Sequence, residues 1–147
     1  RIIVDLDAED GRESLRGVVA LAAHNSKSRS DVELYCTLSA EATSPEHPAH
    51  EYFVERYDNV RKAGVGSFER LQKAGRLRSD ISPARAGIMT IALLDGLQLQ
   101  WVLDSDSVDM ADELRAFFES IVDFGPDWSW DAESTSTTPP KHINTQS

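Results

Sequence analysis

The chain has 147 residues, a formal net charge of −10, and 40% hydrophobic and 27% charged side chains. This length suits one domain with its own hydrophobic core, and the acidic balance argues against direct contact of this chain with a nucleic-acid backbone. The single cysteine, Cys36, excludes a disulfide within the chain and fits a reducing, cytoplasmic location. Residues 1–7 contain no apolar stretch that would serve as a signal peptide.

Two short helices are predicted in the first third of the chain. Between Gly11 and Asn25 the apolar side chains recur at helical spacing, which predicts a helix over 11–25. The polar run NSKSRS interrupts the pattern. Ser30 or Asp31 can cap a second helix over about 30–43, which contains the Cys36 thiol as a small apolar side chain.

A long amphipathic helix follows the breaker segment SPEHP. Pro48 suits the first turn of a helix, and the pattern continues to about Ala74. Its apolar side chains fall on one face of a helical wheel: Ala49, Tyr52, Phe53, Val60, Ala63, Gly64, Leu71 and Ala74. Gly64 and Gly66 each weaken the helix by about 1 kcal/mol relative to Ala, so we expect a bend there.

The next helix, over 84–103, is apolar on almost every side. Gly75 is the expected C-cap of the preceding helix, and Ser82 and Pro83 are the expected N-cap and first residue of this one. Its polar residues are spread around the circumference: Arg85, Thr90, Asp95, Gln98 and Gln100. Such a helix must be covered on several sides, in part by a second molecule. A membrane span is disfavoured, because placing its polar side chains Asp95, Gln98 and Gln100 in lipid would cost free energy.

A last helix is predicted over 108–124, with a broad apolar face of about 160°. From Gly125 the composition becomes polar, which predicts a mobile tail over 125–147 that Trp128 and Trp130 could pin at its start. No alternating strand pattern occurs. We therefore expect an all-α domain over 1–124, a helical bundle of about five helices.

Charge is distributed unevenly along the chain. Residues 56–85 contain eight basic and three acidic side chains, whereas residues 95–133 contain eleven acidic and one basic. Blocks of this kind can pair across helices or across subunits, although solvated faces are the commoner explanation.

Catalytic and metal motifs are weak in this sequence. His47 and His50 are spaced for one helix face, but without a third ligand we explain them by capping and solvation, and we expect no metal. There is no Gly-rich phosphate loop, no nucleophile elbow and no paired-cysteine motif. We expect neither an enzyme nor a cofactor.

Polar side chains inside the apolar helix admit two interpretations. Asp95, Gln98 and Gln100 either form hydrogen bonds across helices or subunits, or one or two of them face an internal cavity and orient a ligand. If Asp95 faces a cavity, its carboxylate favours a cationic or hydrogen-bond-donating ligand.

Three segments together resemble the C-terminal regulatory domain of TetR-type transcriptional regulators: ELYCTLSAEATSPEHPAHEYFVERY, AGRLRSDISPARAGIMTIALLDGLQLQWVLD and SVDMADELRAFFESI. The resemblance covers about 15–121. It implies an all-helical domain that forms a homodimer and encloses an effector pocket. The two helices 83–104 and 108–124 would build a four-helix bundle at the dimer axis, where Gly87 and Gly96 would allow close approach, and the other helices would surround the pocket.

Candidate site residues follow from the aromatic and polar side chains that could line such a cavity and from this resemblance. Candidate ligand-binding residues are Tyr35, Cys36, Phe53, Tyr57, Phe68, Met89, Leu93, Asp95, Gln98 and Trp101. Candidate dimer-interface residues are Ile88, Ala92, Gly96, Leu97, Leu114, Phe117, Phe118 and Ile121.

Members of this family carry an N-terminal helix-turn-helix domain, which this chain lacks, so we expect a fragment of a longer regulator. Its function would be to bind a small-molecule effector and, as a dimer, to control DNA binding by that missing domain. The alternative is a stand-alone helical dimer that binds a partner protein or sequesters a small ligand without a role on DNA.

Overall fold

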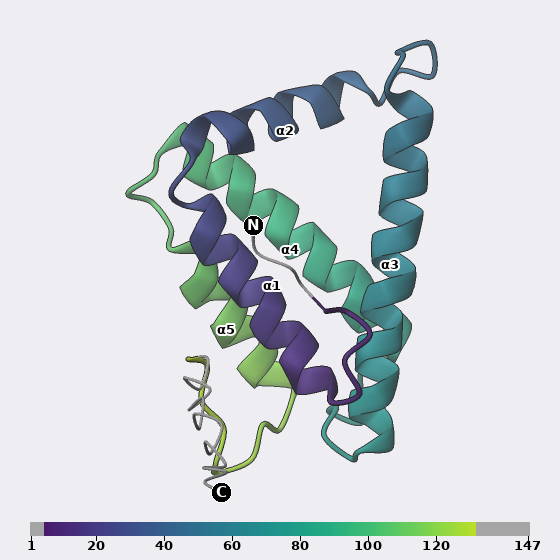
Figure 1. The fold of residues 1–147 in the computed structure, drawn as a ribbon, viewed down its shortest axis with the longest axis vertical. Coiled ribbons are helices and arrows are strands. Elements are labelled where there is room, and N and C mark those ends of the chain that lie inside the picture. The colour runs from purple at the N-terminus through teal and green to yellow at the C-terminus, as the bar shows by residue number, and fades with distance from the viewer. Residues whose placement is uncertain (1–4, 132–147) are drawn as a thin grey trace, which may run out of the picture.

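The computed structural model describes residues 5–131, which form an all-α fold (Figure 1). The prediction of five helices is confirmed. In chain order they are α1 (Gly11–Asn25), α2 (Arg29–Glu41), α3 (His50–Lys73), α4 (Pro83–Leu103) and α5 (Met110–Ile121).

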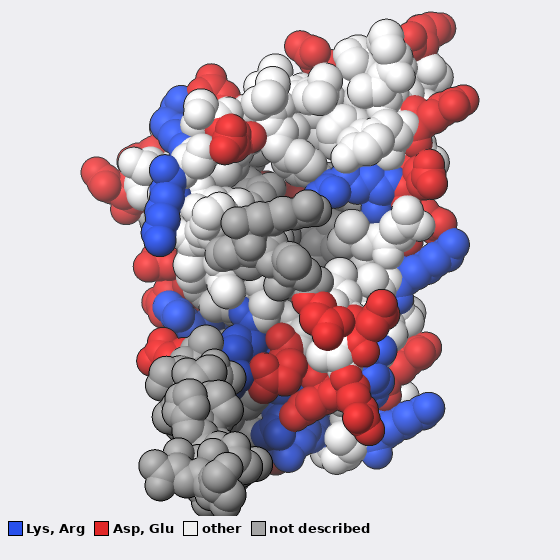
Figure 2. Space-filling view, viewed as in Figure 1, with Lys and Arg blue, Asp and Glu red and all other residues white. Residues whose placement is uncertain are grey.

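Helix α4 is the centre of the arrangement. It packs against α2, α3 and α5, while α1 packs against α5 and α3 and touches α2. Helices α2, α3 and α4 form the three sides of a triangular frame, with α1 and α5 beside α4 (Figure 1). On the face shown in Figure 2, basic side chains are interspersed with acidic ones and no continuous basic surface forms.

Three helices begin at side-chain caps. The carboxylates of Asp10 and Asp109 and the hydroxyl of Ser82 each accept a hydrogen bond from a backbone N–H of the first turn, as predicted for Ser82. The predicted cap of the second helix was wrong. Helix α2 runs over Arg29–Glu41 instead of about 30–43, with Ser28 at the N-cap position and no side-chain hydrogen bond to a backbone N–H of the first turn. The Ser28 hydroxyl donates instead to Asp31 Oδ2 at 2.7 Å.

Two further predicted helices are also longer than the observed ones. Helix α3 starts at His50, two residues after Pro48. Helix α5 is shorter than 108–124 at both ends, because Asp109 caps it and Val122 leaves it in an extended conformation with φ −125° and ψ 132°. That extended residue pairs with Leu77 of the α3–α4 loop in an isolated antiparallel bridge.

Glycines fix the end of α3 and its crossing with α4. Gly75 has φ 70°, which lets Arg76 N–H turn back and donate to the Leu71 carbonyl at 2.9 Å. Helix α3 is unbroken through Gly64 and Gly66. A methyl group on Gly87 would lie 3.1 Å from the Val65 nitrogen, so the two helices cross at small residues.

The core lies where α5 meets α1, α3 and α4. Phe68 of α3 packs against Phe118 of α5 with ring centroids 6.4 Å apart, and Leu15 of α1 and Leu114 of α5 are buried beside them. Four residues expected at a dimer interface are instead buried inside the single chain: Leu97, Leu114, Phe118 and Ile121. In α5 the apolar face that carries Leu114, Phe118 and Ile121 is turned toward the core of the single chain.

The start of the C-terminal segment packs on the body. Trp130 stacks on Phe118 at 6.4 Å and its indole N–H donates to Glu119 Oε1 at 2.8 Å. Trp128 lies beneath Arg16, whose guanidinium is 4.0 Å from the ring centroid. The expected mobility of the tail concerns mostly residues 132–147, which lie outside the described part of the chain.

Helix α4 has the length and composition of a membrane span. In the fold it is nevertheless packed on three other helices, and Asp95 and Gln98 lie in its middle. A packed core helix of a soluble protein has this same character.

Candidate ligand-binding site

A polar cluster occupies the frame formed by α2, α3 and α4. Each helix contributes one member: Tyr35 from α2, Tyr57 from α3 and Asp95 from α4. The Tyr57 hydroxyl donates to Asp95 Oδ2 at 2.5 Å, and the Tyr35 hydroxyl lies 3.4 Å from that of Tyr57. The three side chains therefore form one chain of hydrogen bonds across the frame.

Two hollows lie on either side of this cluster. The first, of about 290 Å³, adjoins α1 and is lined by Leu21, Asn25, Asp31, Val32, Tyr35, Arg56, Leu94, Asp95 and Gln98. The second, of about 380 Å³, has no α1 residue and is lined by Tyr35, Cys36, Ser39, Ala40, Thr43, Tyr57, Asp95, Gln98 and Leu99. We call them the α1-side hollow and the α4-side hollow. Tyr35, Asp95 and Gln98 belong to both and form the wall between them.

A third hollow of about 300 Å³ continues from the α4-side hollow along α2 and α3. It shares Ser39, Thr43 and Tyr57 with that hollow and adds Phe53, His50 and Arg61. Phe53 lies edge-on to Tyr35, with ring centroids 5.8 Å apart. The frame thus contains a polar centre with aromatic walls, which is the usual composition of a small-molecule site.

Burial sets the electrostatics of the cluster. Asp95 is half-buried, and loss of solvation raises the pKa of its carboxyl above the usual range. Burial and the contact with Asp95 raise the pKa of the Tyr57 hydroxyl, so Tyr57 remains a hydrogen-bond donor. Burial likewise raises the pKa of the Cys36 thiol, helped by the charge of Asp95.

The structure brings six of the candidate ligand-binding residues to these hollows: Tyr35, Cys36, Phe53, Tyr57, Asp95 and Gln98. The other four lie elsewhere. Phe68 and Trp101 are buried in the core and Leu93 packs against it. Met89 is exposed on the outer side of α4. Helical periodicity marks these four as apolar but does not show which neighbour each one meets.

Several lining residues were missed by the sequence reasoning. Asn25 of α1 and Asp31 of α2 looked like polar helix ends, yet both line the α1-side hollow. Arg56 lines the same hollow, with its guanidinium 5.5 Å from the Tyr35 ring centroid. Its place one residue before Tyr57 was the only signal in the sequence.

The outer side of α4 carries an apolar stripe. It consists of Ile88, Met89, Ala92, Gly96, Leu99 and Leu103, which recur at helical spacing. Its four large side chains are 45–78% exposed. Exposed apolar residues usually lie singly on a protein surface, whereas these form one continuous stripe. Ile88, Ala92 and Gly96 were interface candidates. The remaining one, Phe117, is partly buried against the core.

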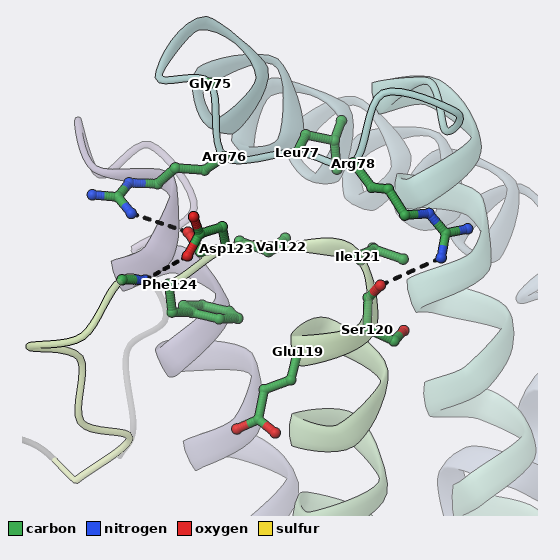
Figure 3. A pocket seen from close by; sticks show the side chains of 11 residues that line it. Gly75, Arg76, Leu77, Arg78, Glu119, Ser120, Ile121, Val122, Asp123 and Phe124 are labelled. Carbon is green, nitrogen blue, oxygen red and sulfur yellow. Dashed lines mark hydrogen bonds between the residues drawn. The ribbon is translucent and has the colours of Figure 1, made fainter.

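Another hollow lies away from this frame (Figure 3). It has a volume of about 590 Å³ between the α3–α4 loop and the segment that follows α5. Its polar side chains serve the local fold: Arg76 Nη1 donates to the Asp123 carbonyl at 3.0 Å and Arg78 Nη1 to the Ser120 carbonyl at 3.4 Å. We assign no ligand to it.

His47 and His50, the pair considered above for metal binding, have local partners. Nδ1 of His50 lies 2.7 Å from the Ala42 carbonyl oxygen, and Nε2 of His47 lies 3.8 Å from Glu41 Oε2. Within residues 5–131, no group of three or more His, Cys, Asp or Glu side chains is arranged to hold a metal ion.

Comparison with protein families decides the assignment. The family of C-terminal domains of BetI-type transcriptional repressors matches residues 11–123, which span all five helices. The chain belongs to this family. The predicted resemblance to a TetR-type regulatory domain is thereby confirmed. No curated protein and no solved structure matches the chain.

This repressor domain is a regulatory module in a family of soluble, non-enzymatic proteins. The polar cluster combines hollow space with hydrogen-bonding groups from α2, α3 and α4.

Proposed function

We propose that this chain is the effector-binding and dimerisation domain of a TetR-like repressor, and that a small molecule binds in the frame of α2, α3 and α4. The observation that carries the proposal is the Tyr57–Asp95 pair. A half-buried carboxylate with a raised pKa lies between two hollows instead of in a closed, fully paired core. Perturbed carboxyls that line cavities are typical of binding sites.

The chemistry of the hollows favours one kind of effector. Asp95 accepts hydrogen bonds, while Tyr35, Phe53 and Tyr57 provide aromatic surface around it. A lipophilic molecule with a cationic or hydrogen-bond-donating group satisfies both features. Arg56 lines the α1-side hollow and its charge also acts on Asp95, so a hydrogen-bond-donating group is favoured there and a cationic group on the α4-side, which Arg56 does not line.

Helix α1 offers a route from the effector to the DNA-binding domain of the longer protein. Its C-terminal end lines the α1-side hollow through Leu21 and Asn25. Its N-terminal end is close to α3, since a methyl group on Gly11 would lie 2.6 Å from the Ser67 carbonyl. An effector that favours one position of α1 would shift the population of DNA-binding states by its differential affinity for them.

Dimerisation is proposed through the apolar stripe of α4. The stripe is uncharged along its length and leaves large aliphatic side chains in water, which a second copy of the chain would cover. In the cell the dimer would act in the cytoplasm, with DNA bound through the N-terminal domain and not through this acidic chain.

A thermal-shift screen tests effector binding. A panel of lipophilic amines and neutral amides is measured against the wild-type chain, because binding to the folded state alone raises the unfolding temperature. We expect amines to raise it and the Asp95→Asn variant to lose most of that shift. Leu34→Ala, on the exposed outer side of α2, is the matched control and should keep it.

Three results would count against the proposal. If no compound in the panel shifts the wild-type chain, effector binding is not supported. If Asp95→Asn and Leu34→Ala respond alike, the site lies elsewhere. If a bound effector shows equal affinity for free and DNA-bound full-length protein, the regulatory switch is excluded, and sequestration of the ligand by a stand-alone dimer becomes the better explanation.

A further inference from the structure

We propose that the α4-side hollow is completed by a second copy of the chain, so that dimerisation closes the mouth of the effector site. This inference rests on the dimerisation proposed above. It adds that the partner forms part of the effector site, which dimerisation by itself does not require.

Leu99 connects the two features. It is 53% exposed as a member of the apolar stripe, and it also lines the α4-side hollow together with Asp95. On the helix, Leu99 lies on the stripe edge nearest the hollow, because Asp95 is one turn before it. A surface that covers the stripe as far as Leu99 therefore reaches the rim of the hollow.

The opposite rim is also exposed. Ala40 and Thr43 of the α2 end are exposed to solvent and line the same hollow, whereas Cys36, Asp95 and Gln98 lie deeper. Its mouth is thus bounded by exposed residues of two helices, and no described segment of the chain covers it. The α1-side hollow differs, since Leu21 and Asn25 of α1 form one of its walls.

The charges at the ends of the stripe favour a second copy over an unrelated partner. Arg85 is exposed before the first apolar residue, and Asp104 and Asp106 are exposed after the last. The stripe runs from Ile88 to Leu103 and is about 23 Å long at 1.5 Å per residue. When two copies pair antiparallel about a two-fold axis, Arg85 of each chain meets the acidic end of the other.

Such closure has a physical consequence for binding. A partner over the rim would exclude water from the hollow and strengthen the interaction of Asp95 with an effector. Effector and partner would then stabilise each other's binding by the same factor.

The single cysteine of the chain provides the test, because Cys36 lines the hollow in question. The rate at which 5,5′-dithiobis(2-nitrobenzoate) reacts with Cys36 is measured over a range of protein concentrations, and sedimentation velocity reports the oligomer in the same samples. Leu103→Glu and Ile88→Glu, at opposite ends of the stripe and outside the hollow, disrupt the dimer. Leu34→Glu is a matched control away from the stripe.

We expect wild type and Leu34→Glu to react about tenfold more slowly as dimers than as monomers, and both stripe variants to react at the monomer rate at every concentration. Circular dichroism confirms that the variants are folded. If wild type is dimeric yet reacts as fast as the stripe variants, closure is overturned while dimerisation stands. If wild type is monomeric throughout, the dimer itself is overturned, and the inference with it.

Discussion

Tyr57 of α3 donates a 2.5 Å hydrogen bond to Asp95 of α4, and this pair joins two helices at the centre of the frame. Further along, the same two helices cross at Gly64 and Gly87, where no side chain separates them. The pair therefore lies where α3 and α4 have diverged enough to leave space for other molecules.

Removing the Tyr57 hydroxyl should destabilise the fold. Tyr57→Phe leaves a half-buried carboxylate without its donor, and losing a hydrogen bond to a charged group costs about 1–3 kcal/mol. The free energy of unfolding is measured by urea titration. Tyr52→Phe, at a tyrosine that is 60% exposed, is the control and should change little. Equal stability of the two variants would show that the pair contributes nothing to the fold.

The raised pKa of Asp95 predicts a specific pH dependence. The folded state holds the Asp95 proton more tightly than the unfolded state, so this group favours folding fully below its unfolded pKa. That contribution is lost as the pH rises through the folded pKa. From about pH 4 upward, the unfolding free energy of wild type should therefore fall relative to that of Asp95→Asn. Parallel pH profiles for the two proteins would contradict the assignment.

The prediction concerns the difference in unfolding free energy between wild type and Asp95→Asn, because other carboxyls change the unfolding free energy with pH in the opposite direction. Hydrogen bonding to Arg12 lowers the pKa of Asp10, which adds stability above the unfolded pKa of that group and loses it in acid. The difference between the two proteins cancels this contribution.

A Leu→Ala substitution should have different consequences in the core and in the apolar stripe of α4. Leu114→Ala removes a fully buried side chain and should cost about 2–5 kcal/mol of unfolding free energy. Leu103→Ala removes a side chain that is 78% exposed and should leave the stability of the monomer within about 0.5 kcal/mol. Leu103→Ala should instead weaken association, which analytical ultracentrifugation measures. If Leu114→Ala weakens the dimer but leaves the unfolding free energy unchanged, Leu114 is an interface residue and not a core residue.

Two glycines of α4 form a matched pair. A methyl group at Gly87 would lie 3.1 Å from the Val65 nitrogen and 3.3 Å from Val65 Cγ2, whereas at Gly96 it meets nothing within 4 Å. Both changes to Ala gain about 1 kcal/mol of helix propensity. Gly87→Ala should then be less stable than Gly96→Ala by about 1–3 kcal/mol, because the crossing with α3 must widen. Thermal or urea unfolding of dilute, monomeric samples measures this difference, and similar stabilities would argue against a tight crossing.

The helices were predictable because their signals are local. Ser82 and Pro83 at the start of α4, and Gly75 after α3, act through contacts within a few residues. The error at the end of α5 has a different origin, because Val122 pairs with Leu77, which is distant in sequence. The start of α2 was misplaced although its Ser28–Asp31 contact is local.

The partners of the apolar side chains were not predictable in the same way. Helix α4 is apolar all round, so periodicity alone does not distinguish Leu97, which faces the core, from Leu99, which faces solvent. In α5, periodicity likewise did not show that Leu114 and Phe118 are buried in the core of the single chain, where Phe118 packs against Phe68 of α3. Asp95 was identified because a carboxylate in an apolar helix requires a partner.

Helix α2 is held less firmly than the other walls of the site. Val32 is its only fully buried residue, whereas α1, α4 and α5 each bury five. The Tyr35–Tyr57 contact at 3.4 Å and the Arg29 hydrogen bond to the Val102 carbonyl at 3.1 Å are weak or exposed ties. The cost of displacing α2 is therefore small compared with that of opening the core. We therefore expect α2 to move away from α3 and α4 more easily than the other helices, which would let the site accept molecules larger than the present hollows while the core stays folded.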